Sequence, residues 1–157
     1  MTVQVEVLSA ATDEAIDAFR RLLPQLSRSA PALDQAALTA VVKCLANTVL
    51  VSRSAGQING TLTLVMFPIP TGTRAWIEDV VVDEAARGQG AGVALTQEAL
   101  RLARAAGART VDLTSRPSRE AAGRLYERAG FQMRESRLYR FDFGAEQANG
   151  APAASAG

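Results

Sequence analysis

The feature that most constrains this chain is a glycine-rich turn at residues 87–92, which reads Arg-Gly-Gln-Gly-Ala-Gly. An apolar segment over 75–82, which predicts a buried strand, precedes the turn, and strong helix formers over 90–106 follow it. Glycines let the backbone approach a ligand without Cβ clashes. The helix directs unpaired N–H groups and its positive dipole end to the same place. This strand–turn–helix unit therefore predicts a pyrophosphate-binding site.

Three other interpretations of the turn have different requirements. A Walker A loop needs Gly-Lys-Ser/Thr after the glycines, whereas Val93 and Ala94 follow here. A dinucleotide-binding fingerprint needs a third glycine at position 93, where this chain has valine. The third interpretation is a turn that serves only close packing of strand and helix. The flanking strand and helix, together with Arg87 at the start of the turn, favour the phosphate site over packing alone.

The remaining segments predict one α/β domain over residues 1–143. We expect helices over about 13–27, 34–45, 90–106 and 118–129, and strands over 3–7, 48–53, 60–67, 75–82, 110–115, 131–133 and 138–143. The predicted architecture is a mixed, mostly antiparallel sheet of six to seven strands flanked by four helices. Residues 144–157 are small and have no apolar periodicity, so we expect a flexible C-terminal tail.

Composition and charge limit the classes of partner. Lys and Arg number 17 against 16 Asp and Glu, so no overall basic excess supports a nucleic-acid partner. The sequence has neither a signal-peptide pattern nor an apolar run long enough for a transmembrane helix. Cys44 is the only cysteine, which excludes an intrachain disulfide and fits a reducing compartment. We therefore expect a soluble, cytoplasmic protein without a membrane or nucleic-acid partner.

The chain contains no histidine. This excludes a Ser-His-Asp triad, a Cys-His pair and any metal site that uses histidine. No clustered Asp/Glu motif suggests a carboxylate site, so we expect no metal. Cys44 lies in a predicted amphipathic helix without a histidine to activate it, and we interpret it as a packing residue. We interpret Trp76, the single tryptophan, as a core residue.

Two motifs together resemble the GCN5-related N-acetyltransferase (GNAT) superfamily. Residues 87–92 match that family's Gln/Arg-x-x-Gly-x-Gly/Ala signature, and residues 125–131, Leu-Tyr-Glu-Arg-Ala-Gly-Phe, match its tyrosine-bearing helix before a Gly-Phe strand entry. The resemblance covers residues 75–143 in sequence and residues 1–74 in architecture only. With Ile-Glu-Asp at 77–79, the chain looks most like the small single-domain members, such as the glucosamine-phosphate acetyltransferases.

The resemblance implies that acetyl-CoA is the co-substrate and that the reaction needs no metal. Backbone groups of Val80, Val81 and Val82 should pair with the pantetheine arm like an added strand. Many family members have asparagine seven residues before the tyrosine, whereas this chain has Arg119, which we expect to meet a CoA phosphate instead. The resemblance assigns the pyrophosphate to the turn residues Arg87, Gly88, Gln89, Gly90, Ala91 and Gly92.

The catalytic expectations follow from the needs of acetyl transfer to an amine. Glu78 is the candidate base that takes the amine's proton, directly or through water. Asp79 should point to the opposite face of the strand unless a bulge re-aims it. By family analogy, the N–H of Val80 donates to the developing oxyanion, and Tyr126 gives a proton to the leaving thiolate.

The predicted function is an N-acetyltransferase that acts on a primary amine of a small molecule or peptide by direct attack in a ternary complex. The alternatives are a non-catalytic acyl-CoA-binding regulatory module on the same fold and a protein-interaction domain that retains only the scaffold. The presence of both Glu78 and Tyr126 favours the enzyme. A homodimer is a further expectation from the family.

Overall fold

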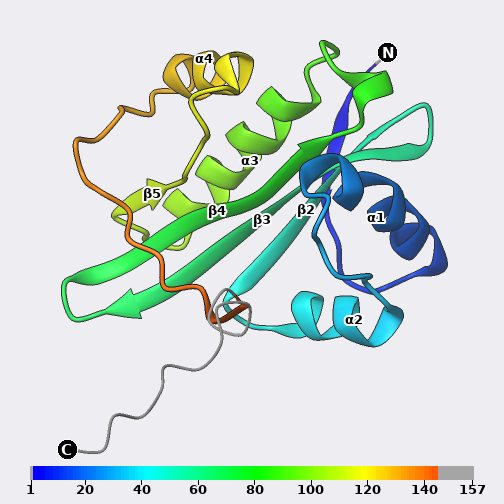
Figure 1. The fold of residues 1–157 in the computed structure, drawn as a ribbon, viewed down its shortest axis with the longest axis horizontal. Helices are drawn as coiled ribbons and strands as arrows, with labels where there is room; N and C mark the ends of the chain where they lie inside the picture. The colour runs from blue at the N-terminus through cyan, green and yellow to red at the C-terminus, as the bar shows by residue number, and fades with distance from the viewer. Residues whose placement is uncertain (1, 145–157) are drawn as a thin grey trace, which may run out of the picture.

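The fold is one twisted sheet with helices on both faces (Figure 1). The computed structural model describes residues 2–144. Its elements are β1 (Gln4–Val7), α1 (Asp13–Leu26), α2 (Gln35–Lys43), β2 (Asn47–Ser54), β3 (Gln57–Ile69), β4 (Gly72–Val82), the 3₁₀ turn η1 (Glu84–Ala86), α3 (Ala91–Ala105), β5 (Thr110–Asp112) and α4 (Glu120–Arg128). The predicted order of elements is confirmed as far as α4.

The sheet has the order β1-β2-β3-β4-β5. The first four strands pair antiparallel, and β5 lies parallel to β4. Between β2 and β3, Ala55 (φ 49°) and Gly56 (φ 77°) form the two-residue turn, because a tight hairpin needs positive φ at both central positions. β3 and β4 are longer than the strands expected over 60–67 and 75–82, and they are joined by a tight turn at residues 70–71.

Local sequence signals position the first two helices. The Thr12 hydroxyl accepts from the N–H of Ala15 at 3.1 Å, which caps α1. The carboxylate of Asp34 accepts from the N–H of Ala37 at 2.8 Å, which caps α2. The apolar face of α1, centred on Leu22, is fully buried against the sheet. None of the helices in the described residues combines the length and apolarity needed to cross a membrane.

Two apolar cores flank the sheet. One core joins α1 and α2 to one face through Leu22, Leu38, Val51 and Val81. The other joins α3 to the opposite face through residues that include Leu64, Ala75, Ile77 and Leu95. The central strands are therefore covered by α3 on one face and, over part of their length, by α1 and α2 on the other (Figure 1).

The prediction of six to seven strands is wrong: the sheet has five. Neither 131–133 nor 138–143 forms a strand, although residues 138–143 are rich in apolar side chains. A strand requires a partner edge, and β5, with only three residues, offers a short one. Residues 131–142 instead have no regular structure, and the segment crosses β4 and β3 (Figure 1). The side chains of Tyr139, Phe141 and Phe143 are exposed. Apart from Gly144, the predicted tail lies outside the described residues.

Candidate functional site

A β-bulge in β4 is the structural centre of the site. Thr61 of β3 faces Val81, whereas Thr63 faces Glu78, so Asp79 and Val80 together oppose one residue of β3. Asp79 has φ 50°, the left-handed conformation that absorbs the extra residue. Such a bulge is the feature that was expected to re-aim one of the two carboxylates, Glu78 and Asp79, if it was present.

The bulge resets the in–out alternation of β4. Before it, Ile77 belongs to the core under α3, which places Glu78 on the opposite face. After it, Val81 is buried in the core under α1, whereas Val80 and Val82 pack toward α3. The side chains of Val80, Val81 and Val82 are therefore packing groups, and only their backbone is available to a ligand.

One edge of β4 is open beyond its first residues. β5 pairs only with Arg74, Ala75 and Trp76. From Ile77 to Val82, no strand within residues 2–144 pairs with this edge of β4. Unpaired backbone groups of a strand edge bind an extended chain by strand addition. The geometry at Val80–Val82 supports the predicted role of these residues toward a pantetheine arm.

The glycine turn has the conformation that the phosphate-binding interpretation requires. Gly88 has φ 78° and Gly90 has φ 91°. Gly90 also precedes the first residue of α3, whose N-terminus has no side-chain cap. A Cβ added at Gly88 or Gly90 would meet no atom within 4 Å, so these glycines serve backbone conformation in open space rather than packing. The turn leaves the amino end of α3 accessible to an anion.

Gly92 differs from Gly88 and Gly90, because at this position the absence of a side chain permits close packing. A Cβ at this position would lie 3.1 Å from Cδ1 of Leu125 and 3.9 Å from Cγ2 of Val82. The close contact brings α4 against the first turn of α3, which itself lies next to the end of β4. The helix that carries Tyr126 therefore lies beside the end of the glycine turn.

Tyr126 is half-buried on α4. Its ring packs edge-on against Phe131, with centroids 5.8 Å apart and planes at 67°. Burial raises the pKa of Tyr126, and the guanidinium of Arg119 offsets part of that rise. Among the described residues, no group forms a hydrogen bond with its hydroxyl. The phenol stays protonated at neutral pH and can donate to a ligand.

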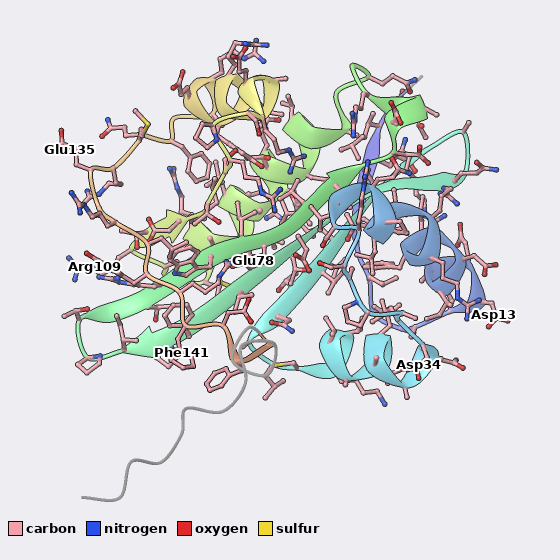
Figure 2. All side chains as sticks on the ribbon, in the orientation of Figure 1. Asp13, Asp34, Glu78, Arg109, Glu135 and Phe141 are labelled. Carbon is pink, nitrogen blue, oxygen red and sulfur yellow. The ribbon has the colours of Figure 1, made fainter. Side chains whose placement is uncertain are left out.

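Glu78 lies at the molecular surface on β4 (Figure 2). Nevertheless, partial burial raises the pKa of Glu78, and the neighbouring carboxylate of Asp79 raises it further. The guanidinium of Arg140, from the C-terminal segment, acts in the opposite direction and lowers this pKa. A carboxylate whose pKa is raised is a better proton acceptor than an ordinary surface glutamate.

Some of the predicted environments differ from those observed. Trp76, expected in the core, is half-buried and belongs to neither core. Cys44, expected to pack, is exposed at the end of α2. Arg140 was not among the residues predicted from the sequence, because the path of the C-terminal segment over β4 has no local signal. Within the described residues, no group of three or more Cys, Asp or Glu side chains is placed to hold a metal ion.

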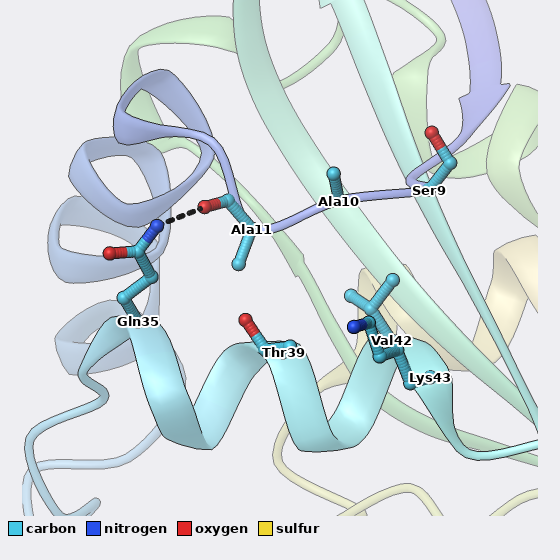
Figure 3. Close-up of a pocket in the computed structure, with 7 residues that line it drawn as sticks. All are labelled: Ser9, Ala10, Ala11, Gln35, Thr39, Val42 and Lys43. Atoms are coloured by element: carbon cyan, nitrogen blue, oxygen red, sulfur yellow. Dashed lines mark hydrogen bonds between the residues drawn. The ribbon is translucent and has the colours of Figure 1, made fainter.

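Two hollows lie away from these residues. One, of about 230 Å³, is formed by the segment after β1 and by α2 (Figure 3). There the side-chain amide of Gln35 donates to the carbonyl of Ala11 at 3.2 Å. The other, of about 370 Å³, lies between α1 and the loop before α2. Neither is lined by Glu78, Tyr126 or the glycine turn.

Comparison with protein families identifies one match. The model described as "Acetyltransferase (GNAT) family" matches residues 11–131, a range that contains the bulge, the glycine turn and Tyr126. No curated protein matches the chain.

Solved structures share the fold. A Trypanosoma brucei acetyltransferase is 28% identical with a TM-score of 0.73, and a transcriptional regulator from Bacillus halodurans is 26% identical with a TM-score of 0.75. In both comparisons the match covers 90% of this chain and 100% of the other. Glucosamine-6-phosphate N-acetyltransferase from Arabidopsis thaliana, at 19% identity and a TM-score of 0.72, covers 90% of this chain and 99% of its own, and shows the fold alone.

Proposed function

Since the chain belongs to the GNAT family of acetyltransferases, we propose that it transfers the acetyl group of acetyl-CoA to a primary amine of a small molecule or peptide. The proposal rests on one observation: the open edge of β4, the glycine turn and the helix of Tyr126 follow one another in space. The open edge of β4 leads into the glycine turn, and the helix of Tyr126 packs against the end of that turn. A strand edge, an anion site and a proton donor therefore lie along one path.

Two parts of the chain would hold acetyl-CoA. The backbone of Val80–Val82 offers hydrogen-bonding groups to the amide-containing arm. The N–H groups of Gly88–Gly92 and the amino end of α3 suit the pyrophosphate. Arg87, in the turn, and Arg119, close enough to Tyr126 to affect its pKa, add positive charge for phosphate groups.

In the proposed reaction, every proton that is released is taken up by a named group. Acetyl-CoA supplies the acetyl group as a thioester. Glu78 accepts a proton from the amine, whose nitrogen forms the new C–N bond while the C–S bond breaks. The N–H of Val80 donates to the carbonyl oxygen as negative charge develops there. Tyr126 gives a proton to the sulfur, so the products are an acetylamide and the free thiol. Solvent returns the proton from Glu78 to Tyr126.

A second candidate is a non-catalytic acyl-CoA-binding regulatory module. One structural relative is described as a transcriptional regulator, which favours keeping this alternative. It would use the β4 edge and the glycine turn but would not need Glu78 or Tyr126. The proposal also includes a cytoplasmic location, which the single cysteine fits, and a homodimer, which light scattering after gel filtration would test.

The release of free CoA thiol separates the two candidates. The protein is incubated with acetyl-CoA and, in turn, with amino sugars, polyamines, amino acids, aromatic amines and peptides. We expect thiol release that depends on both the protein and one class of amine, and that persists in the presence of a chelator. Binding of acetyl-CoA without amine-dependent thiol release from any class would support the regulatory module.

The phosphate site makes a separate prediction. Gln89→Glu adds one negative charge to the turn at an exposed position, and we expect acetyl-CoA affinity to fall about 10- to 100-fold by calorimetry. The control Gln89→Ala removes the amide without adding charge and should bind within about threefold of wild type. Gly90→Asp should weaken binding further and also lower stability, because its backbone has φ 91°. Unchanged affinity in Gln89→Glu would place the pyrophosphate elsewhere.

A further inference from the structure

The face of the sheet opposite α3 carries an apolar patch that neither core uses. Ala75 and Ile77 point toward α3, so alternation along β4 places Trp76 on the other face. Its cross-strand partner is Val65, and Phe67 lies two residues further along β3 on the same face. We call Val65, Phe67 and Trp76 the open face.

The open face is only partly covered. All three of its side chains are half-buried, and none belongs to the core of α1 and α2 or to that of α3. The C-terminal segment crosses β4 and β3 here, yet Phe141 remains 69% exposed and does not seal the face (Figure 2). Aromatic and β-branched side chains are therefore available to a flat apolar group that lies against them.

Charged groups occupy the two ends of the open face. Glu78 follows Trp76 by two residues on the same face of β4, with Asp79 beside it at the bulge. Arg74 precedes Trp76 by two residues, about 13 Å from Glu78 along the strand. Arg140 approaches Glu78 from the C-terminal segment, close enough to affect its charge. None of the ion pairs found in residues 2–144 joins Arg140 to Glu78.

This charge pattern suits one positive charge and disfavours several. An ammonium group that reaches Glu78 meets two carboxylates, which attract it. The guanidinium groups of Arg74 and Arg140 oppose the attraction of those carboxylates, which disfavours an acceptor that carries a second ammonium group. The positive charge of Arg140 also disfavours the protonated form of a bound amine, which helps to produce the nucleophilic free base.

Resting on the proposed function, we propose that the open face binds the body of the acetyl acceptor, and that this acceptor is an arylalkylamine: a flat apolar body with a single primary amine. The amine lies at Glu78, and its aromatic ring lies on Trp76, Val65 and Phe67. Amines with several positive charges and small hydrophilic amines are poor acceptors. The apolar body should increase kcat/KM about 10- to 100-fold over an amine that lacks it.

Matched amines and variants test the acceptor class by turnover. We expect kcat/KM for 2-phenylethylamine to exceed that for ethanolamine and for 1,4-diaminobutane by about 10- to 100-fold. Trp76→Ala should reduce the phenylethylamine value to near that of ethanolamine, a much larger fold loss than the one it causes for ethanolamine itself. Trp76→Phe, which keeps a flat surface, should retain most of the preference. The control Val7→Ala removes an exposed apolar side chain on β1 and should change neither value.

Fluorescence gives a readout that does not depend on turnover. Trp76 is the only tryptophan, so its emission reports directly on the open face. We expect a saturable change in emission with 2-phenylethylamine and none with ethanolamine. A preference for 1,4-diaminobutane, an equal loss for every amine in Trp76→Ala, or unchanged emission would overturn the acceptor class. Emission that responds to 2-phenylethylamine without acetyl transfer would contradict the proposed function and leave the binding face supported.

Discussion

Tyr126→Phe is expected to lower turnover about 10²–10⁴-fold, the usual size of a general-acid contribution. The substitution removes only the hydroxyl and keeps the ring that packs edge-on against Phe131. Acetyl-CoA affinity and Tm should therefore hardly change. The loss should appear in kcat, because the proton is needed as the thiolate leaves and not when the substrates bind.

The control for this prediction is Tyr139→Phe. Tyr139 is the only other tyrosine and is 85% exposed on the C-terminal segment. Its variant should turn over at the wild-type rate. If Tyr126→Phe also retained the wild-type rate, Tyr126 would be a packing residue, and the thiolate would have to take its proton from water.

Glu78→Gln is expected to reduce kcat/KM about 10²–10⁴-fold near neutral pH and by less at high pH. Glutamine cannot accept the amine's proton, whereas at high pH more of the amine is already free. In the wild type, kcat/KM should fall as the pH drops through the pKa of Glu78. Because burial and Asp79 raise that pKa, the acidic limb of the pH profile should have its midpoint above the ordinary pKa of glutamate.

The same shift predicts the sign of the effect on stability. A carboxyl group whose pKa is higher in the folded state binds protons more tightly there than in the unfolded chain. Stability therefore decreases as the pH rises from the ordinary value through the raised pKa of Glu78. Removing the charge in Glu78→Gln should leave Tm at neutral pH unchanged or slightly higher, so lost activity could not be attributed to unfolding.

Two variants control the Glu78 prediction. Glu127→Gln changes an exposed glutamate on α4 and should leave the pH profile unchanged. Asp79→Asn removes the neighbouring negative charge and should move the acidic limb to lower pH. A loss in Glu78→Gln that is the same at every pH would show that Glu78 positions the acceptor and does not take its proton.

The helices and the glycine turn were predictable because their signals are local. Thr12 and Asp34 cap α1 and α2 as their positions suggest. Gly90 takes the positive φ that the turn requires. Such features depend on a few neighbouring residues, and these are read directly from the sequence.

The bulge was harder to predict because it depends on the register between β3 and β4. The sequence does contain a signal: two acidic residues, Glu78 and Asp79, separate Ile77 from three consecutive valines, which breaks simple alternation. The bulge explains this break, since Ile77 and Val80 face α3 while Val81 faces α1. The face of the sheet on which each of the two carboxylates lies depends on the register between β3 and β4.

The structure of the C-terminal segment could not be predicted from sequence patterns. Residues 138–143 were expected to form a closing strand, but a strand also needs a partner edge, and β5 ends at Asp112. Arg140 comes close enough to lower the pKa of Glu78 because of the path that this segment takes. Such long-range contacts join residues more than 60 positions apart and leave no local pattern.

Mass spectrometry of the reaction products tests the central claim most directly. The protein is incubated with acetyl-CoA that carries an isotope label in its acetyl group and with 2-phenylethylamine alongside the other amine classes. We predict that one amine class gains the labelled acetyl group while an equal amount of free CoA forms, and that Tyr126→Phe greatly slows both. Label that stays on CoA with every amine, or that appears only as acetate, would contradict an acetyltransferase that acts on amines.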